Sequence, residues 1–383
     1  MTSNTTAQLK RVMITLAEHS ADVHASHFVR SLRQLRPDIE ISALGGDALK
    51  SAGVNVFFDT VRNAAMGWRG LLRAREMKQR LAFVAQLYAT NKPDLHVCCD
   101  SWTMNVHFAR LAKSFGVPVL YYIAPQAWAS REGRVKELAR VADQLACILP
   151  FEEAFFRERG VKATYVGHPL FDQPRHEILP GDPYRVALPC GSRRSIARSN
   201  FPRQFKVALD ILHQRPATRF VIPTTDVTHD VVAQIVGGDS RFELIRNDFD
   251  RAVSGCGLAI TVSGTATLHL AALGVPMIVV YQGSRFLWHA VGRWIIRTRT
   301  YAMVNLLAAN GRDEPSRHIV QEFIPWYGSV KPVCDAALRL LESPELLKKQ
   351  RAAIASIVEK VNASGASIRV AEMACELLDQ RRS

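Results

Sequence analysis

The sequence predicts an α/β protein built from two doubly wound, Rossmann-like domains. Short apolar runs rich in β-branched residues alternate with helical patterns along most of the 383 residues. This alternation is typical of parallel βαβ units. It breaks at residues 169–183, where four prolines stand among polar residues, and then restarts. Because a chain of this length exceeds one comfortable hydrophobic core, we expect two domains joined near these prolines.

The first half contains a series of strand candidates with helical patterns between most of them. The run at 94–99 is apolar almost throughout, which favours a strand buried on both faces. The strands are expected at 11–16, 39–44, 94–99, 117–123, 144–149 and 163–166. The helices are expected at 21–35, 81–89, 105–115 and 135–141. Ligands of such sheets bind beyond the carboxyl ends of the strands, so polar residues that directly follow a strand are the first site candidates.

The second half repeats the alternation and ends in a long charged helical pattern. Its strands are expected at 185–188, 219–222, 242–245, 258–262 and 276–281. Its helices are expected at 201–215, 227–236 and 265–273, with the final helical pattern at 344–382. Two similar halves predict a ligand cleft between the domains.

Charge and composition narrow the class of protein. The formal charge of +14 favours anionic partners, such as phosphorylated substrates or acidic lipids. Nucleic acid is disfavoured because the basic residues are dispersed and no binding motif is present. The seven cysteines lack metal-binding spacing, which predicts reduced thiols in a cytoplasm and no metal site. No signal peptide, apolar run long enough to span a membrane, P-loop or dinucleotide fingerprint is found.

Polar residues follow two strand candidates of the first half. Asp100 comes directly after the run at 94–99, where a carboxylate can act as a general base. Capping of the next helix is the alternative for this residue. Glu18, Ser20 and Asp22 cluster after the first strand, where they either face a ligand or cap the following helix. The sequence leaves both interpretations open.

Two loops of the second half predict a phosphate site. Ser263, Gly264 and Thr265 follow a strand and open a helix; Ser263 can cap the helix and Gly264 allows close approach of a ligand. Ser192 and Arg193 follow the strand at 185–188, where charge-assisted hydrogen bonds can hold an anion. An ordinary capped helix and a basic surface loop would give the same patterns.

Two stretches combine tryptophan with arginine on an apolar background. The first, 66–73, contains Met66 and Trp68, and the second covers 285–299. Such helices suit the headgroup boundary of a membrane. Packing of each helix on its own domain explains the pattern equally well.

These features occur together and in order, and on them the sequence resembles the lipid-A-disaccharide synthase family, which consists of GT-B-fold glycosyltransferases of family 19. The similarity runs from about residue 12 to at least residue 309. It includes LPFE at 149–152, GHPL at 167–170 and SGTATL at 263–268. The other matching segments are 17–22, 66–67, 100–105, 122–129, 133–134, 191–193 and 305–307.

The resemblance implies an acceptor-side domain at residues 1–172, onto which a C-terminal helix at about 366–383 packs, and a UDP-sugar-binding domain at 173–365. It implies an inverting enzyme, peripheral on the cytoplasmic face of the inner membrane. The enzyme would transfer 2,3-diacylglucosamine from UDP-2,3-diacylglucosamine to the 6-hydroxyl of 2,3-diacylglucosamine 1-phosphate. No cofactor is implied, and a homo-oligomer is left open.

The resemblance also assigns roles to individual residues. Asp100 would be the base and Glu18 would help to orient the substrates. The donor would be bound by Arg193, Ser192, Ser263, Gly264, Thr265, His269 and Asn305. The acceptor or membrane side would contain Met66, Trp68, Asn105 and Trp128.

Several positions depart from the family pattern. His269 stands where the family has a glutamate expected to bind the ribose diol of UDP, and Gln282 replaces an arginine. Ala17 and Ala21 replace two glycines. These departures motivate two alternatives: a non-catalytic relative that binds a nucleotide sugar or an acidic lipid, and another GT-B reaction such as UDP-N-acetylglucosamine 2-epimerisation.

Overall fold

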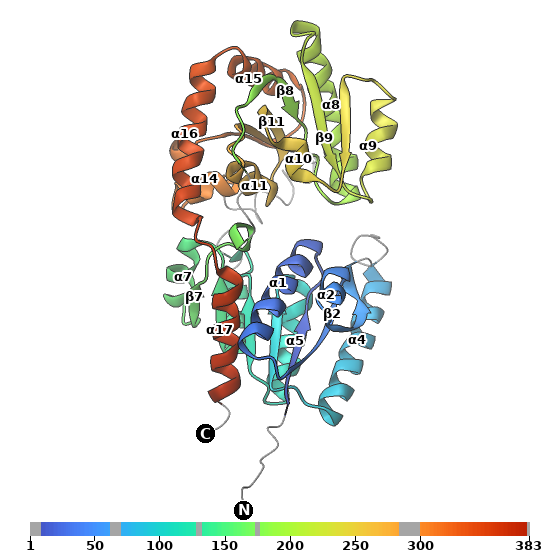
Figure 1. The fold of residues 1–383 in the computed structure, drawn as a ribbon, viewed down its shortest axis with the longest axis vertical. Coiled ribbons are helices and arrows are strands. Elements are labelled where there is room, and N and C mark those ends of the chain that lie inside the picture. The colour runs from blue at the N-terminus through green and yellow to red at the C-terminus, as the bar shows by residue number, and fades with distance from the viewer. Residues whose placement is uncertain (1–8, 62–69, 128–131, 173–176, 283–298, 381–383) are drawn as a thin grey trace, which may run out of the picture. The chain divides into compact units, whose positions relative to one another are not determined.

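The computed structural model describes residues 9–61, 70–127, 132–172, 177–282 and 299–380. The chain divides into two compact α/β units (Figure 1): unit 1 contains residues 1–173 and 363–383, and unit 2 contains residues 174–362. Each unit is built on a parallel sheet. Within the described ranges, no helix combines the length and the apolar character needed to cross a membrane.

Unit 1 has a seven-stranded sheet in the order β3-β2-β1-β4-β5-β6-β7, the doubly wound order of a Rossmann-like fold. Its strands are β1 (Lys10–Thr15), β2 (Ile39–Gly45), β3 (Asn55–Asp59), β4 (Leu95–Cys99), β5 (Val119–Tyr122), β6 (Gln144–Cys147) and β7 (Ala163–Tyr165). Its helices are α1 (His19–Leu35), α2 (Asp47–Ser51), α4 (Gly70–Thr90), α5 (Trp102–Ser114), α6 (Glu132–Val141), α7 (Pro150–Arg157), η2 (Pro169–Asp172) and α17 (Ala366–Asp379).

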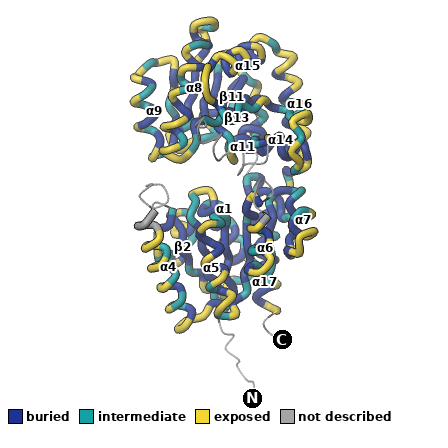
Figure 2. The backbone as a smooth tube through the Cα atoms, turned by 180° about the vertical axis from the view of Figure 1, so that it is seen from behind, coloured by how far each residue is buried: buried dark blue, intermediate teal, exposed yellow. Residues whose placement is uncertain are grey.

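Alternation along the strands distributes side chains to two layers of helices. Leu95, Val97 and Cys99 of β4 join a buried cluster with α1 and α17, whereas Cys98 joins a second cluster with α4, α5 and α6. Successive strand residues point to opposite faces, so helices on both sides bury the sheet. Figure 2 shows the buried strands inside the more exposed helices. The apolar character of the run at 94–99 follows from this double burial.

Unit 2 has a six-stranded sheet in the order β10-β9-β8-β11-β12-β13. Its strands are β8 (Asp182–Ala187), β9 (Arg219–Thr224), β10 (Phe242–Arg246), β11 (Cys256–Val262), β12 (Met277–Gln282) and β13 (Gln321–Trp326). Its helices are α8 (Arg194–Gln214), α9 (His229–Val236), α10 (Phe249–Val253), α11 (Ala266–Ala272), α14 (Met303–Ala308), η4 (Pro315–Arg317), α15 (Lys331–Leu341) and α16 (Pro344–Val361). Two buried clusters again occupy the two faces of the sheet.

Asp172 joins the two chain segments that form unit 1. Its carboxylate accepts hydrogen bonds from the backbone N–H groups of Gly365 (2.8 Å), Ala366 (2.8 Å) and Ser367 (2.7 Å). These groups belong to the start of α17, where the first amides lack partners within the helix and a negative charge is favourable. Asp172 therefore fixes the end of the first segment to the beginning of the second.

The expected strands are present, with ends shifted by a few residues, but two further strands were not predicted. These are β3 and β13, which lie at the edges of the two sheets. Both are only partly buried, so they lack the continuous apolar run that identifies a central strand. The final helical pattern is also two helices, because the chain breaks between α16 and α17 at Gly365, whose φ is +88°.

Candidate active site

The loops after β1 and β4 leave the sheet of unit 1 side by side. The two strands are neighbours, with Thr15 opposite Cys98. The backbone N–H of Ala17, in the first loop, donates a hydrogen bond to Oγ of Ser101 in the second (3.1 Å). The parallel sheet thus carries Glu18 and Asp100 to the same edge, as expected from their positions after consecutive central strands.

The turn at the end of β4 has an unusual backbone. Asp100 and Ser101 have φ values of +51° and +48°, and Ile123, after the adjacent β5, has +69°. Each such residue costs about 1–3 kcal/mol and persists only where the surroundings hold it. The Asp100 N–H donates to the Tyr122 carbonyl (2.9 Å), and the Tyr121 hydroxyl donates to the Asp100 carbonyl (2.9 Å). The main chain of Asp100 is therefore held on both sides.

Asn105 lies beneath this turn and is fully buried. Its Nδ2 contacts the carbonyl oxygens of Thr15 (3.0 Å), Cys99 (3.1 Å) and Asp100 (2.8 Å), and its Oδ1 accepts from the Thr15 hydroxyl (2.7 Å). The sequence assigned Asn105 to the acceptor side. With its amide occupied by main chain, we propose instead that it positions the turn.

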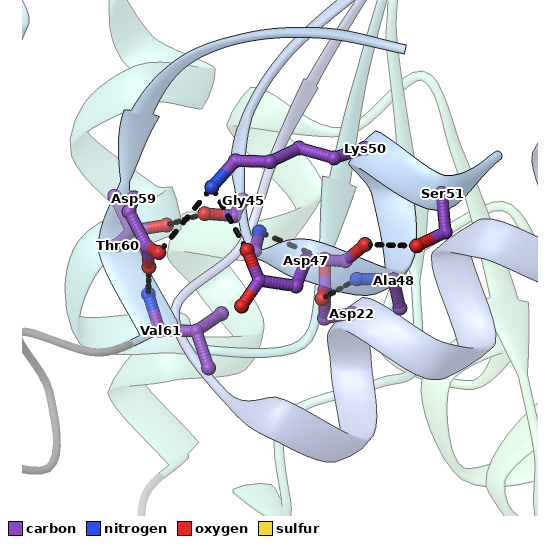
Figure 3. A network of polar contacts seen from close by, with 10 residues as sticks. Asp22, Gly45, Asp47, Ala48, Lys50, Ser51, Asp59, Thr60 and Val61 are labelled. Atoms are coloured by element: carbon purple, nitrogen blue, oxygen red, sulfur yellow. Dashed lines mark hydrogen bonds and ion pairs between the residues drawn. The ribbon is translucent and has the colours of Figure 1, made fainter. Parts of the chain in front are cut away.

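Ser101, and not Asp100, occupies the N-cap position of α5, and its own side chain makes no capping hydrogen bond. Asp22 does not cap the helix that it was expected to cap. It lies buried in the first turn of α1, but its carboxylate accepts from Gly46 N–H (2.9 Å) and Ala48 N–H (2.8 Å), so it caps α2 (Figure 3). Glu18, at the N-cap of α1, is partly exposed and remains the acidic candidate of this loop.

In unit 2, the loop between β8 and α8 presents a cation at a helix start. Arg193 is the N-cap residue of the 21-residue helix α8, and both Ser192 and Arg193 are exposed. Gly191 has φ +96°, and a Cβ there would lie 2.8 Å from Cγ2 of Ile196. A helix N-terminus beside a guanidinium is suited to binding an anion. A glycine is favoured at position 191 because the backbone has a positive φ there and a Cβ would be too close to Ile196.

Cys190, which directly precedes Gly191 in this loop, turns inward. Its side chain is fully buried, and burial raises the pKa of the thiol to about 12. The neighbouring Pro189 carbonyl accepts a hydrogen bond from the N–H of Val262 (3.1 Å), which ties the loop to the end of β11. The thiol of Cys190 is thus neutral and lies in the core, and the side chains of Ser192 and Arg193 remain exposed.

The second phosphate-site candidate, at the end of β11, is supported from below. Gly264 has φ +143° and open space where a Cβ would stand, and both Gly264 and Thr265 are exposed. The Ser263 hydroxyl donates to the Tyr301 carbonyl (3.0 Å), so the expectation that it caps the helix is wrong. The Thr267 hydroxyl donates to the Gly264 carbonyl (2.9 Å). Two side chains thus fix an exposed turn.

His269 follows this turn and has an acidic partner. Its Nε2 lies 2.6 Å from Oδ1 of Asp250, and its ring stacks on Phe249 with 4.7 Å between ring centroids. Both side chains of the pair are partly exposed, at 30% for His269 and 22% for Asp250. The Asp250 carboxylate therefore lies next to the side chain of His269, the position at which the family has a glutamate.

Asn305 is fully buried, unlike the substrate contact expected from the sequence. Its Nδ2 donates to the carbonyl of Val320 (2.9 Å) and to Oε1 of Glu322 (2.6 Å), and its Oδ1 accepts from the N–H groups of Ile319 and Val320. These bonds connect α14 to the chain that enters β13. We propose that Asn305, like Asn105, positions main chain.

Glu322 completes this arrangement and was not predicted. Its carboxylate accepts from the N–H groups of Tyr301 (2.8 Å) and Ala302 (3.0 Å) at the start of α14. Burial, with the Glu322 carboxylate nearby, raises the pKa of the Tyr301 phenol to about 12. Because the Tyr301 carbonyl receives the Ser263 hydroxyl, Glu322 supports the 263–265 turn indirectly.

Sequence reasoning missed several supporting residues besides Glu322. Asp250 gives no signal, because its partner His269 is distant in sequence. Thr15 and His96 do give one, since each is a polar residue at a fully buried position of a central strand. A buried polar group requires hydrogen-bond partners, so such residues predict a network below the site.

Four of the expected features lie outside the described residues. They are Met66, Trp68, Trp128 and the stretch 285–298. Among the residues that are described, no group of three or more His, Cys, Asp and Glu side chains is arranged to hold a metal ion.

Comparison with known proteins identifies the family. The profile described as lipid-A-disaccharide synthetase matches residues 12–374. The chain belongs to the lipid-A-disaccharide synthase family. The synthase of Geobacter sulfurreducens is 34% identical over 100% of both chains, and that of Geobacter metallireducens is 33% identical over 98% of this chain and 100% of the relative. The protein is thus a glycosyltransferase of lipid A disaccharide synthesis.

Solved structures agree with the GT-B fold. UDP-GlcNAc 2-epimerase from Neisseria meningitidis, bound to UDP-GlcNAc, superposes with a TM-score of 0.62 at 12% identity, covering 97% of this chain and 100% of the epimerase. The glycotransferase of kitacinnamycin gives 0.60 at 14% identity, with 97% and 99% covered. At such identities the likeness shows the fold alone. The sequence family, and not the fold, separates the synthase from the epimerase alternative.

Proposed function

We propose that this family member is an inverting enzyme that transfers 2,3-diacylglucosamine from UDP-2,3-diacylglucosamine to the 6-hydroxyl of 2,3-diacylglucosamine 1-phosphate. The products are the β-1,6-linked disaccharide and UDP. The proposal depends above all on Asp100, a carboxylate held on a fixed turn at the carboxyl end of β4. A base in such a position needs no further rearrangement before it meets its substrate.

In the proposed step, Asp100 accepts the proton of the acceptor 6-hydroxyl. The oxygen forms a bond to the anomeric carbon of the donor while the bond from that carbon to the diphosphate breaks. The electron pair leaves with UDP, and attack from the opposite side inverts the anomeric configuration. Glu18, at the same edge of the sheet, hydrogen-bonds to the acceptor and orients it.

Unit 2 binds the donor in this proposal. Negative charge develops on the departing diphosphate, and preorganised donors that meet this charge lower the barrier. Arg193 and the start of α8 supply a cation and amide groups, and the exposed turn of Gly264 and Thr265 supplies a second set. Ser192 and Ser263 belong to the same two loops.

His269 takes the place of the glutamate that the family is expected to use for the ribose diol. With Nε2 lying 2.6 Å from the Asp250 carboxylate, a neutral ring would offer Nδ1 as an acceptor for a ribose hydroxyl. Asp250 fixes the ring orientation and, through its second oxygen, adds a carboxylate near the same position. We propose that this pair preserves donor binding despite the substitution.

The substrates also suggest where the enzyme works. Both carry acyl chains, so the protein must meet them at a membrane surface. The net charge of +14 favours anionic headgroups. We therefore propose peripheral binding at the cytoplasmic face of the inner membrane.

The test is a product assay by mass spectrometry with UDP-2,3-diacylglucosamine and 2,3-diacylglucosamine 1-phosphate, alongside calorimetric titration with UDP. We expect the disaccharide 1-phosphate and UDP to form in equal amounts. Departures such as His269 favour one competing function, a non-catalytic relative. UDP binding without any disaccharide would support that alternative and reject the proposal.

A further inference from the structure

Four buried side chains form a continuous hydrogen-bonded chain that ends on the Asp100 turn. The Tyr88 hydroxyl lies 2.5 Å from Nδ1 of His96, and Nε2 of His96 lies 2.9 Å from Oγ1 of Thr15. Oγ1 of Thr15 lies 2.7 Å from Oδ1 of Asn105, whose Nδ2 reaches the Asp100 carbonyl. At most 2% of each of the four side chains is exposed. This series of hydrogen bonds runs from α4 through β4, β1 and α5 to the Asp100 turn.

The backbone carbonyl oxygens around Asn105 determine which group donates in each hydrogen bond of this network. Nδ2 of Asn105 faces carbonyl oxygens, so its Oδ1 must accept the Thr15 proton. Oγ1 of Thr15 then accepts from Nε2–H of His96, which leaves Nδ1 of His96 to accept from the Tyr88 hydroxyl. Burial lowers the pKa of His96 to about 3, so the ring is neutral and keeps this single tautomer.

The chain ends at the residues that need support most. Asn105 contacts the last carbonyl of β1, the last carbonyl of β4 and the carbonyl of Asp100 itself. Asp100 and Ser101 adopt left-handed conformations that ordinary residues avoid. Without its Thr15 partner, Asn105 would have a buried oxygen with no donor and would lose its fixed orientation.

We propose that Thr15, His96 and Tyr88 are positioning residues that act through Asn105 to aim the Asp100 carboxylate at the acceptor hydroxyl. This inference rests on the proposed role of Asp100 as the base. The four side chains do not touch substrate. They set the geometry of the base, so their loss lowers turnover more than binding.

The test compares Thr15→Val with Thr15→Ser. Valine keeps the shape of threonine and removes the hydroxyl, whereas serine keeps the hydroxyl and removes a methyl group. Because misplacement of a catalytic group by about 1 Å costs about 10²-fold, we expect Thr15→Val to lower kcat by about 10- to 100-fold. KM for both substrates and the affinity for UDP should remain near wild-type values. Thr15→Ser should retain kcat within about threefold of wild type.

Two outcomes would overturn the proposal. One is a wild-type kcat in Thr15→Val while Asp100→Asn loses about 10³-fold in kcat. The other is an equal loss of kcat in the valine and serine variants. In the Asp100→Asn background, Thr15→Val should have no further effect on turnover, because it acts through the carboxylate already removed. Near wild-type kcat in Asp100→Asn would instead refute the base assignment of the proposed function, whatever the result for Thr15.

Thermal unfolding and UDP titration show whether each variant is folded. If Thr15→Val fails to fold, Tyr88→Phe decides, since it removes one oxygen at the far end of the chain. A fall in kcat of about threefold or more, with unchanged KM, supports the proposal. Wild-type kcat in folded Tyr88→Phe rejects it.

Discussion

At the carboxyl edge of unit 1, buried polar side chains hold the turn that carries Asp100, whereas the corresponding edge of unit 2 presents glycine, serine and arginine to solvent. The first edge has two consecutive non-glycine residues at positive φ, supported by Asn105, Tyr121 and the residues behind them. The two candidate loops of the second edge use Gly191 and Gly264 at positive φ, although Asn247, directly after β10, is a non-glycine residue with φ +55°.

The difference reflects the tasks proposed for the two edges. A general base must stand at one distance and angle from a single proton, so its main chain is fixed by a network. A diphosphate has many equivalent oxygens, which an exposed helix start and a long arginine side chain can meet in several ways. Substitutions in unit 1 should therefore change turnover, and substitutions in unit 2 should change donor binding.

The largest effect is expected for Asp100→Asn. Removal of the general base should lower kcat by about 10³-fold and leave UDP affinity and the melting temperature unchanged. Steady-state kinetics and calorimetry measure the two quantities. Asp59→Asn is the control, because Asp59 is a partly exposed carboxylate of the same unit that pairs with Lys50. Loss of UDP binding in Asp100→Asn would contradict the division of tasks.

Arg193→Ala should have the next largest effect, at unit 2. Loss of a guanidinium that meets the departing diphosphate should lower kcat/KM by about 10²-fold and weaken UDP binding. The neighbouring Arg194→Ala removes the same charge one residue further along the exposed start of α8 and should have little effect. Equal losses in both variants would mean that net charge, not position, binds the donor.

A smaller effect is expected at His269. Loss of one ribose hydrogen bond in His269→Ala should lower kcat/KM by about tenfold, with the change in KM for the donor. His269→Glu, which introduces the residue expected for the family, should remain active. Asp250→Asn should fall between the two. If His269→Ala is indistinguishable from wild type in donor KM, the pair does not contact the ribose.

The last prediction concerns acid stability of unit 1. Burial, reinforced by the neighbouring His27, lowers the pKa of His24 to about 4, and burial lowers that of His96 to about 3. Unfolded histidine binds a proton near pH 6.5, so below that pH the unfolded state binds more protons. Stability should therefore fall on acidification by up to about 1.4 kcal/mol per pH unit for each histidine. Urea unfolding at pH 7.5, 6.5 and 5.5 measures the slope, which His24→Asn should reduce.

The sequence predicted the elements that have a strong local pattern. The buried strands β1, β4 and β11 are apolar runs, and the residues that directly follow them form the candidate edges in both units. The edge strands β3 and β13 lack such runs and were missed. Glu322, which supports α14, lies in one of these missed strands.

The individual roles of the site residues were harder to predict. Asn105 and Asn305 match the family motifs, yet both are fully buried and bind main chain. A sequence motif indicates that a residue type is needed at a position. It does not indicate whether the side chain contacts a ligand or hydrogen-bonds to the backbone. Contacts between residues that are distant in sequence, such as Asp250 and His269, can be identified only from the folded structure.

The bond from Asp172 to the start of α17 has a consequence for the order in which the protein forms. Unit 2 is one continuous stretch, so all its residues are available once position 362 has been synthesised. Unit 1 must wait for residues 366–379, which supply Val370, Ala374 and Leu378 to one of its buried clusters. On the ribosome, the segment made first is therefore completed last, and it leaves apolar surface uncovered while the rest of the chain is translated.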